Sequence, residues 1–123
     1  MILVDTSVWI DHLRSGEPKL ATALNKGQVI THPFVLGELA CDNLANRDEV
    51  LKLIGDLSAA PTATHSEVLG FIERYTLMGR SIGYIDVHLL ASAALDGVAR
   101  LWTRDRRLAA AAAVLELAFD EAG

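Results

Sequence analysis

Short, wholly apolar runs alternate along the chain with longer segments in which apolar residues recur every three or four positions. The first pattern is typical of strands buried on both faces of a sheet, and the second of helices that pack one face against it. This alternation predicts an α/β fold with a mainly parallel central sheet. We expect strands at residues 2–4, 28–31, 98–103 and 114–119, with a connection or further short strand at 60–63.

Helical patterns fill the intervals between these runs. Gly27 and Gly97 lie where two of the helices should end, and Thr64 and Glu67 have the spacing of a capping box at the start of another. We expect helices at residues 8–13, 18–26, 33–44, 47–57, 64–75, 84–95 and 105–112. Strands and helices together predict a three-layer α/β/α sandwich with four to five strands, formed as one domain over residues 1–123.

Composition narrows the class of protein. No apolar stretch approaches the roughly 20 residues of a membrane span, and no basic segment precedes Ile2, so we expect a soluble, cytoplasmic protein without a membrane partner. The single cysteine, Cys41, cannot form an internal disulfide, and we expect it to be buried as a small apolar residue. The net charge of -5 has the wrong sign for holding nucleic acid by charge alone, so a polyanionic substrate requires a cation.

Two acids stand just after predicted strands, one of them after an intervening arginine. Asp5 follows the first strand and precedes Thr6 and Ser7, either of which can cap the next helix. Asp105 repeats the arrangement after the strand at 98–103. The carboxyl ends of parallel strands form the rim where ligands bind in open α/β sheets, although an acid at such a corner can also simply assist helix capping.

Two further acids, Glu38 and Asp86, share helical register with apolar residues and are expected on inward-packed faces. Burying a carboxylate costs several kcal/mol, so such groups should be paired with cations or gathered around one. Neighbouring arginines leave a purely structural ion-pair explanation open. A carboxylate set without histidine or cysteine otherwise suits Mg²⁺ or Mn²⁺, and the four acids are expected to converge on one such site.

The sequence resembles the PIN-domain ribonucleases and, within them, the VapC-type toxins of bacterial and archaeal toxin–antitoxin pairs. The resemblance rests on ILVDTSVWI at 2–10, VLGEL at 35–39, GYIDVHLLASAA at 83–94 and LWTRDRRL at 101–108. These stretches occur in the expected order and span nearly the whole chain, while residues 42–80 carry little that is diagnostic. The resemblance implies a PIN-like fold and a metal-dependent endoribonuclease.

For individual positions, the resemblance implies a catalytic and metal-binding set in which Mg²⁺ or Mn²⁺ is held by Asp5, Asp86 and Asp105. Glu38 is then a ligand through water or the group that orients the nucleophile. Supporting roles fall to three other residues, each with an ordinary alternative. Thr6 and Thr103 either orient the ligands or serve in capping and the strand, and Arg104 either contacts phosphate or pairs with Asp105.

The resemblance also implies partners: an RNA substrate, a cognate antitoxin that places an arginine among the carboxylates, and a homodimer joined by apolar residues of the middle helices. A housekeeping PIN nuclease and a noncatalytic partner-binding module are the alternatives. A receiver-like signalling domain is a further alternative. That fold requires a lysine after a later strand, and no lysine follows Lys52. His88 lies on a different helix face from Asp86, which favours a packing or surface role over metal binding.

Overall fold

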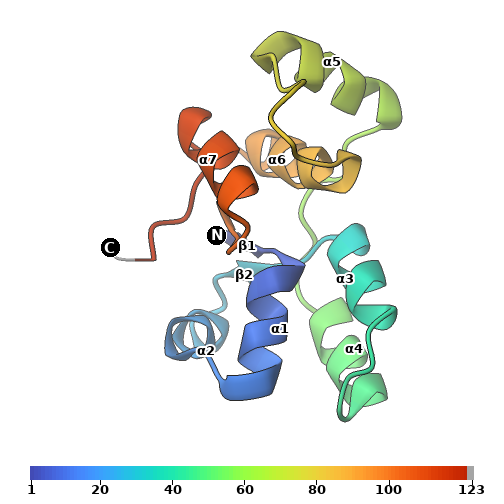
Figure 1. Ribbon diagram of the computed structural model, residues 1–123. Coiled ribbons are helices and arrows are strands. Elements are labelled where there is room, and N and C mark those ends of the chain that lie inside the picture. The colour runs from blue at the N-terminus through green and yellow to red at the C-terminus, as the bar shows by residue number, and fades with distance from the viewer. Residues whose placement is uncertain (122–123) are drawn as a thin grey trace.

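A three-stranded parallel sheet lies between two sets of helices in the computed structural model, which describes residues 1–121 (Figure 1). The central strand is β1 (Ile2–Val4), flanked by β2 (Val29–Ile30) and β3 (Arg100–Trp102). Leu3 is paired with Ile30 on one side and with Leu101 on the other. All three residues of β1 are buried, which explains why this strand is apolar at every position.

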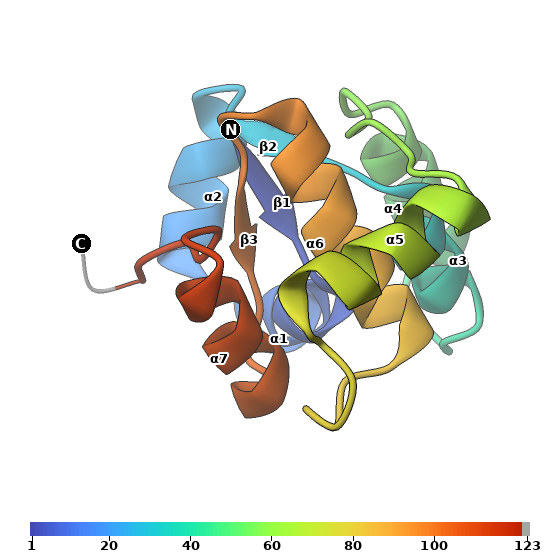
Figure 2. The same ribbon diagram turned by 90° about the horizontal axis from the view of Figure 1, so that it is seen from above.

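The helices form the two outer layers. Below the sheet in Figure 1 lie α1 (Thr6–Ser15), α2 (Pro18–Asn25), α3 (Pro33–Ala40) and α4 (Arg47–Gly55). Above it lie α5 (His65–Tyr75), α6 (Tyr84–Asp96) and α7 (Arg106–Val114). Figure 2 shows α6 and α7 on the near side of the strands and α1 on the far side. The predicted three-layer sandwich is confirmed.

Helix α6 is the most deeply placed of these elements. Every residue from 87 to 93 is buried, so the helix is fixed along the sheet and its first turn is held at the carboxyl ends of the strands. The predicted capping box of α5 is present, since Thr64 accepts a hydrogen bond from the Glu67 amide and Glu67 accepts one from the Thr64 amide. None of the helices within residues 1–121 has both the length and the apolar character needed to cross a membrane.

The prediction of four to five strands was too high. Helix α7 continues through Val114, because the preceding alanine run has high helix propensity, and the expected strand at 114–119 shrinks to one bridge between Leu101 and Ala118. At the other edge, Thr31 forms a single bridge with Ala59 in place of a strand at 60–63. Cys41, expected to be buried, is exposed because α3 ends at Ala40 and the chain leaves the core there.

Candidate active site

Four acidic side chains approach the carboxyl-terminal edge of the sheet from separate elements. Asp5 follows β1 and Asp105 follows β3, while Asp86 lies in the first turn of α6 and Glu38 lies on α3. In the strand order β2-β1-β3, the chain adds β2 on one side of β1 and later β3 on the other, so the strand order reverses between β1 and β3. Ligands of open α/β sheets bind beside such a point, which is where Asp5 and Asp105 emerge.

Asp5 is buried, with 7% of its surface exposed. Its Oδ2 accepts hydrogen bonds from Ser7 Oγ at 2.9 Å and from Thr103 Oγ1 at 2.7 Å, and its amide donates to the Trp102 carbonyl at 2.9 Å. Asp5 itself occupies the N-cap position of α1 but makes no side-chain capping bond. Neither Thr6 nor Ser7 therefore caps this helix, and capping does not account for the acid at position 5.

The two hydroxyls that hold Asp5 also order the chain after β3. Thr103 Oγ1 accepts a hydrogen bond from the Asp105 amide at 3.1 Å, and Ser7 Oγ accepts one from the Arg104 amide at 3.0 Å. Thr103 was predicted to support the site, but Ser7 was considered only as a helix cap. A hydroxyl two residues after an acid, in the first turn of a helix, was the signal available in the sequence.

Asp105 and Asp86 each use one carboxylate oxygen for local structure. Asp105 Oδ1 accepts from the amides of Arg107 at 2.9 Å and Leu108 at 3.2 Å, which caps α7, and Asp86 Oδ2 accepts from the Gly83 amide at 3.2 Å. Within residues 1–121, the second oxygen of each carboxylate receives no protein hydrogen bond. Local capping thus accounts for one oxygen of each carboxylate, and the other oxygen is available to a ligand.

Glu38 departs from its predicted placement. The expectation of an inward-facing acid was wrong, because α3 packs through Val35 and Leu39 and leaves Glu38 exposed at the rim. Thr6 Oγ1 donates to Glu38 Oε1 at 3.2 Å, so this carboxylate is tied to the turn that follows Asp5. Helical register placed Glu38 beside apolar neighbours but did not show on which side α3 would be covered.

The electrostatics show that these acids form one group, called here the acidic cluster: Asp5, Glu38, Asp86 and Asp105. Desolvation raises the pKa of Asp86, and the charges of Asp5 and Asp105 raise it further against the opposing hydrogen bond from Gly83. Desolvation likewise raises the pKa of Glu38, with Asp5 and Asp86 adding to the shift and the bond from Thr6 opposing it. Desolvation is the larger cause in both residues, and repulsion among the carboxylates adds to it.

A cation fits this donor set chemically, because the cluster offers only carboxylate oxygens and positive charge would reverse the repulsion. The side chains do not already form a cage, since no three Asp, Glu, His or Cys residues among those described are grouped closely enough to enclose a metal ion. Two of the carboxylates are turned toward backbone amides, at Gly83 and at the start of α7. Metal capture would therefore have to draw the carboxylates together.

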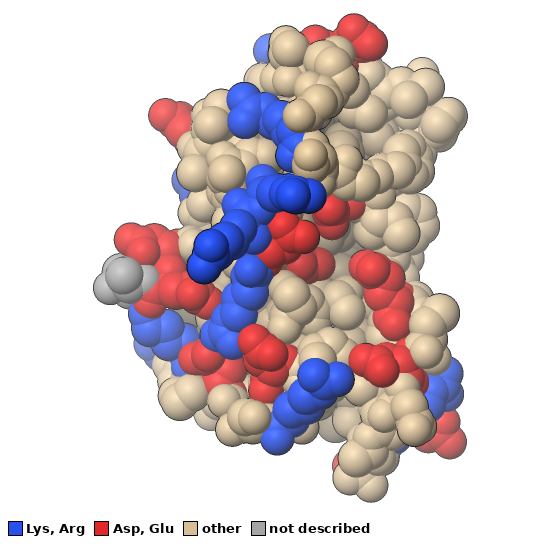
Figure 3. Space-filling view, viewed as in Figure 1, with Lys and Arg blue, Asp and Glu red and all other residues tan. Residues whose placement is uncertain are grey.

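Arg104 does not pair with Asp105. Its guanidinium is bonded to three other carboxylates, those of Asp11, Glu17 and Glu121. Arg106 and Arg107 are exposed, and in the described part of the chain neither forms an ion pair. Figure 3 shows Lys and Arg side chains in a band beside acidic side chains on this face of the molecule. On this face of the molecule, basic side chains thus lie directly beside acidic ones.

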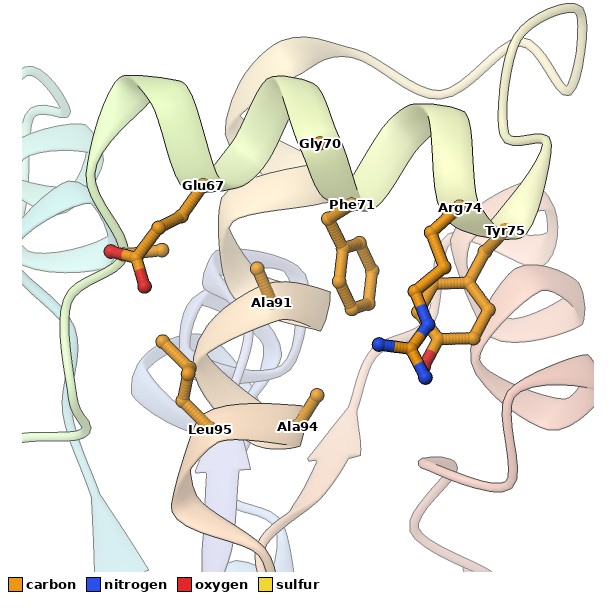
Figure 4. Close-up of a pocket in the computed structure, with 9 residues that line it drawn as sticks. Glu67, Gly70, Phe71, Arg74, Tyr75, Ala91, Ala94 and Leu95 are labelled. Carbon is orange, nitrogen blue, oxygen red and sulfur yellow. The ribbon is translucent and has the colours of Figure 1, made fainter.

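Of the packing and surface roles expected for His88, the structure shows packing in the interior. It is 3% exposed, and its ring meets those of Phe34 and Tyr84 edge-on, with centroids 4.7 Å away in each case. A cleft of about 450 Å³ lies elsewhere, between α5 and α6, where Phe71 and Tyr75 point toward the small residues of α6 (Figure 4). No member of the acidic cluster lines this cleft, so the acids lie on an open rim and not at its base.

Comparison with known proteins agrees with this geometry. The PIN domain family matches residues 2–114. The chain is also 49% identical over 121 residues to Ribonuclease VapC32 from Mycobacterium tuberculosis, in both strain CDC 1551 / Oshkosh and strain ATCC 25618 / H37Rv. Each alignment covers 98% of this chain and 98% of the relative. With four acids at the edge of a parallel sheet and similarity along nearly its whole length, the chain belongs to the PIN-domain family.

Proposed function

We propose that this protein is a metal-dependent endoribonuclease that hydrolyses RNA phosphodiester bonds at the acidic cluster and acts as the toxin of a toxin–antitoxin pair. The observation that carries the proposal is the placement of Asp5, Glu38, Asp86 and Asp105 at one edge of the sheet, and the raised pKa values of Glu38 and Asp86 are consistent with it. The relatives named Ribonuclease VapC32 support the same activity.

Asp5, Asp86 and Asp105 would hold Mg²⁺ or Mn²⁺, with Glu38 at the exposed side of the site. When bound, the ion neutralises the phosphodiester, lowers the pKa of water and stabilises the leaving oxygen. Ser7 and Thr103 hold the Asp5 carboxylate in one orientation through the bonds at 2.9 and 2.7 Å. Glu38, with its raised pKa, orients the attacking water and accepts its proton.

Cationic side chains must also help to bring RNA to a protein of net charge -5. Arg106 and Arg107 are exposed beside Asp105, which suits them to contact the phosphates that flank the scissile bond. Arg104 stays a predicted phosphate contact, but its three carboxylate partners compete with that role. The substrate would therefore lie across the rim, with its backbone along the arginines and the reacting phosphate over the acids.

Two protein partners are proposed, each at a different surface. An antitoxin would neutralise the acidic cluster with an arginine, whose planar fork binds carboxylates in a bidentate manner. A homodimer would use apolar residues of the middle helices, among which Leu53 on α4 and Leu69 on α5 are 61% and 47% exposed. We expect the protein to act in the cytoplasm.

Purified protein tests the activity. RNA should be cleaved with Mg²⁺ or Mn²⁺ and remain intact with chelator. The substitutions Asp5→Asn and Asp86→Asn should each remove most of the activity, because the acids act as a unit. Glu49→Gln provides the matched control, since Glu49 is an exposed acid of α4 outside the cluster. Full activity in either aspartate variant would contradict the assignment.

Expression in a bacterial host separates a toxin from a housekeeping nuclease. We expect growth arrest from the wild-type protein and normal growth from Asp5→Asn at equal expression. Co-expression of the cognate antitoxin should restore growth. A harmless wild-type protein that still cleaves RNA in vitro would favour the housekeeping alternative.

A further inference from the structure

Arg104 joins three parts of the chain that are distant in sequence. Its Nη1 lies 2.7 Å from Asp11 Oδ2 on α1, and its Nε lies 3.3 Å from Glu121 Oε1 near the end of the described chain. Nη2 is bonded to Glu17, which precedes α2. The guanidinium also lies over the ring of Trp102, 6.0 Å from its centroid. Every nitrogen of the guanidinium thus has a carboxylate partner.

The backbone of the same residue is bonded to the site. The Arg104 amide donates to Ser7 Oγ at 3.0 Å, and Ser7 Oγ donates to Asp5 Oδ2 at 2.9 Å. Thr103, the residue before Arg104, donates a hydrogen bond from its hydroxyl to Asp5. Asp105, the residue after Arg104, belongs to the acidic cluster itself. Residues 103–105 therefore form a short segment that bridges two acids, with its central side chain fixed to α1.

We propose that Arg104 is a positioning residue: its ion pairs hold segment 103–105 against α1, and this segment sets the orientation of the Asp5 carboxylate and the place of Asp105. The inference rests on the proposed function and deepens it by assigning a role within the same site. A displacement of about 1 Å in a reacting group can lower a rate roughly 100-fold, so holding this corner matters for catalysis.

The surroundings of Arg104 argue against direct contact with RNA. Three carboxylates around one guanidinium give a local charge that repels phosphate, and an incoming phosphate would have to displace at least one of them. The three partners also raise the pKa of Arg104 above its ordinary value, with Asp11 and Glu17 contributing most. A positioning role and a phosphate-contact role for Arg104 therefore predict different changes in rate and KM when the carboxylate partners of Arg104 are removed.

The decisive comparison is between Arg104→Gln and the double variant Asp11→Asn, Glu17→Gln. If Arg104 positions the site, both should lower the single-turnover rate at saturating RNA by about tenfold or more and weaken Mn²⁺ binding severalfold, with KM changed less than about twofold. If Arg104 contacts phosphate, Arg104→Gln should raise KM with little change in rate, and the double variant should lower KM because it removes two of the three carboxylates bound to the guanidinium. That second pattern would overturn the proposal.

Two further variants complete the design. Arg104→Lys keeps the charge but loses the planar fork, so it should resemble Arg104→Gln, whereas a phosphate contact would be rescued by lysine. Arg14→Gln removes an exposed arginine of α1 that forms no ion pair within residues 1–121, and it should match the wild type. If Arg104→Gln does not fold, the double variant and Arg104→Lys still give the comparison.

Calorimetric titration with Mn²⁺ alone needs no RNA, so it tests the positioning role of Arg104 separately from the proposed RNA cleavage. A wild-type protein that binds Mn²⁺ without cleaving RNA would contradict the proposed function, and weaker Mn²⁺ binding by Arg104→Gln would still support the positioning role. Unchanged Mn²⁺ affinity in both Arg104→Gln and the double variant would overturn it.

Discussion

Thr103 donates a 2.7 Å hydrogen bond to the carboxylate of Asp5, although the two residues lie 98 positions apart in the chain. Both are buried, so the bond is shielded from water and fixes the acid firmly. Thr103→Val keeps the shape of the side chain and removes only the hydroxyl. We expect a loss of about 10-fold to 100-fold in metal-dependent RNA cleavage, as is usual for groups that orient metal ligands.

Thr103→Ser is the control for this prediction, because it keeps the hydroxyl and loses one methyl group. Its cleavage rate should stay close to that of the wild type. Rates measured at saturating Mn²⁺, together with melting temperatures, distinguish a change in the site from a loss of fold. Equal rates for Thr103→Val and Thr103→Ser would show that the hydrogen bond has no part in catalysis.

The raised pKa of Asp86 means that the metal-free fold prefers this acid protonated. The resulting penalty is absent below the unfolded pKa and is complete once the pH exceeds the folded pKa. At pH 7 with chelator, Asp86→Asn should therefore be at least as stable as the wild type. This difference should shrink as the pH falls toward 4, which melting curves at several pH values can check.

Metal binding should stabilise the wild-type fold, because the ion binds the assembled cluster and not the unfolded chain. At 100 times the dissociation constant the gain is about 2.7 kcal/mol, which corresponds to roughly 10 °C in melting temperature for a domain of this size. Asp86→Asn should gain clearly less from Mn²⁺. A wild-type protein without any metal response, combined with a strongly destabilised Asp86→Asn, would identify Asp86 as a structural residue instead.

Glu38 provides a prediction for the pH dependence of the rate. Because desolvation and the charges of Asp5 and Asp86 raise its pKa, the deprotonated form that accepts a proton is lost earlier on acidification than for an isolated glutamate. We expect the cleavage rate to fall on the acidic side, and the fall to move to lower pH as Mn²⁺ is increased. Glu38→Gln should remove this limb, and an unchanged profile in that variant would exclude Glu38 as its source.

His32 should limit stability in acid. Its ring is fully buried, and burial, together with the nearby His88, lowers its pKa to about 4 from the ordinary 6.5. The fold therefore favours neutral His32, so its contribution is complete above pH 6.5 and is lost as the pH falls toward 4. The melting temperature, measured with chelator, should decline over this range.

His32→Asn should flatten that decline, because asparagine can still accept the Phe34 amide hydrogen that His32 Nδ1 accepts at 3.0 Å at the start of α3. His65→Asn removes an exposed imidazole and serves as the control. Comparing the slopes of melting temperature against pH for the two variants isolates the buried ring. Identical slopes for His32→Asn and wild type would assign the acid sensitivity to other groups.

Local patterns predicted the corner at Asp5 well, since a short apolar run followed by an acid and hydroxyls specifies a buried strand that leads into a helix. The same reasoning placed Asp105 after a strand and Asp86 at the start of a buried helix. It failed for the strand at 114–119, where helix propensity in the alanine run prevailed over the apolar pattern.

Features that depend on distant partners lay beyond the sequence. Nothing in the sequence near Arg104 indicates that its guanidinium binds Asp11 and Glu17 and not Asp105. These two partners lie 93 and 87 positions away in the chain. The exposure of Glu38 likewise depends on which side of α3 meets α1 and α4. Both outcomes follow from the packing of whole elements, which residue spacing alone does not determine.

The position of β1 at the centre of the sheet has a consequence for the timing of synthesis. This strand is made well before its partner β3, and Asp5 is made 98 residues before the Thr103 hydroxyl that binds it. Long-range pairing of this kind delays folding until both strands are present. A nascent chain that has not yet released β3 from the ribosome therefore carries Asp5 without its fixed surroundings. The hydrogen-bonded corner around Asp5 can therefore assemble only after β3 has been made.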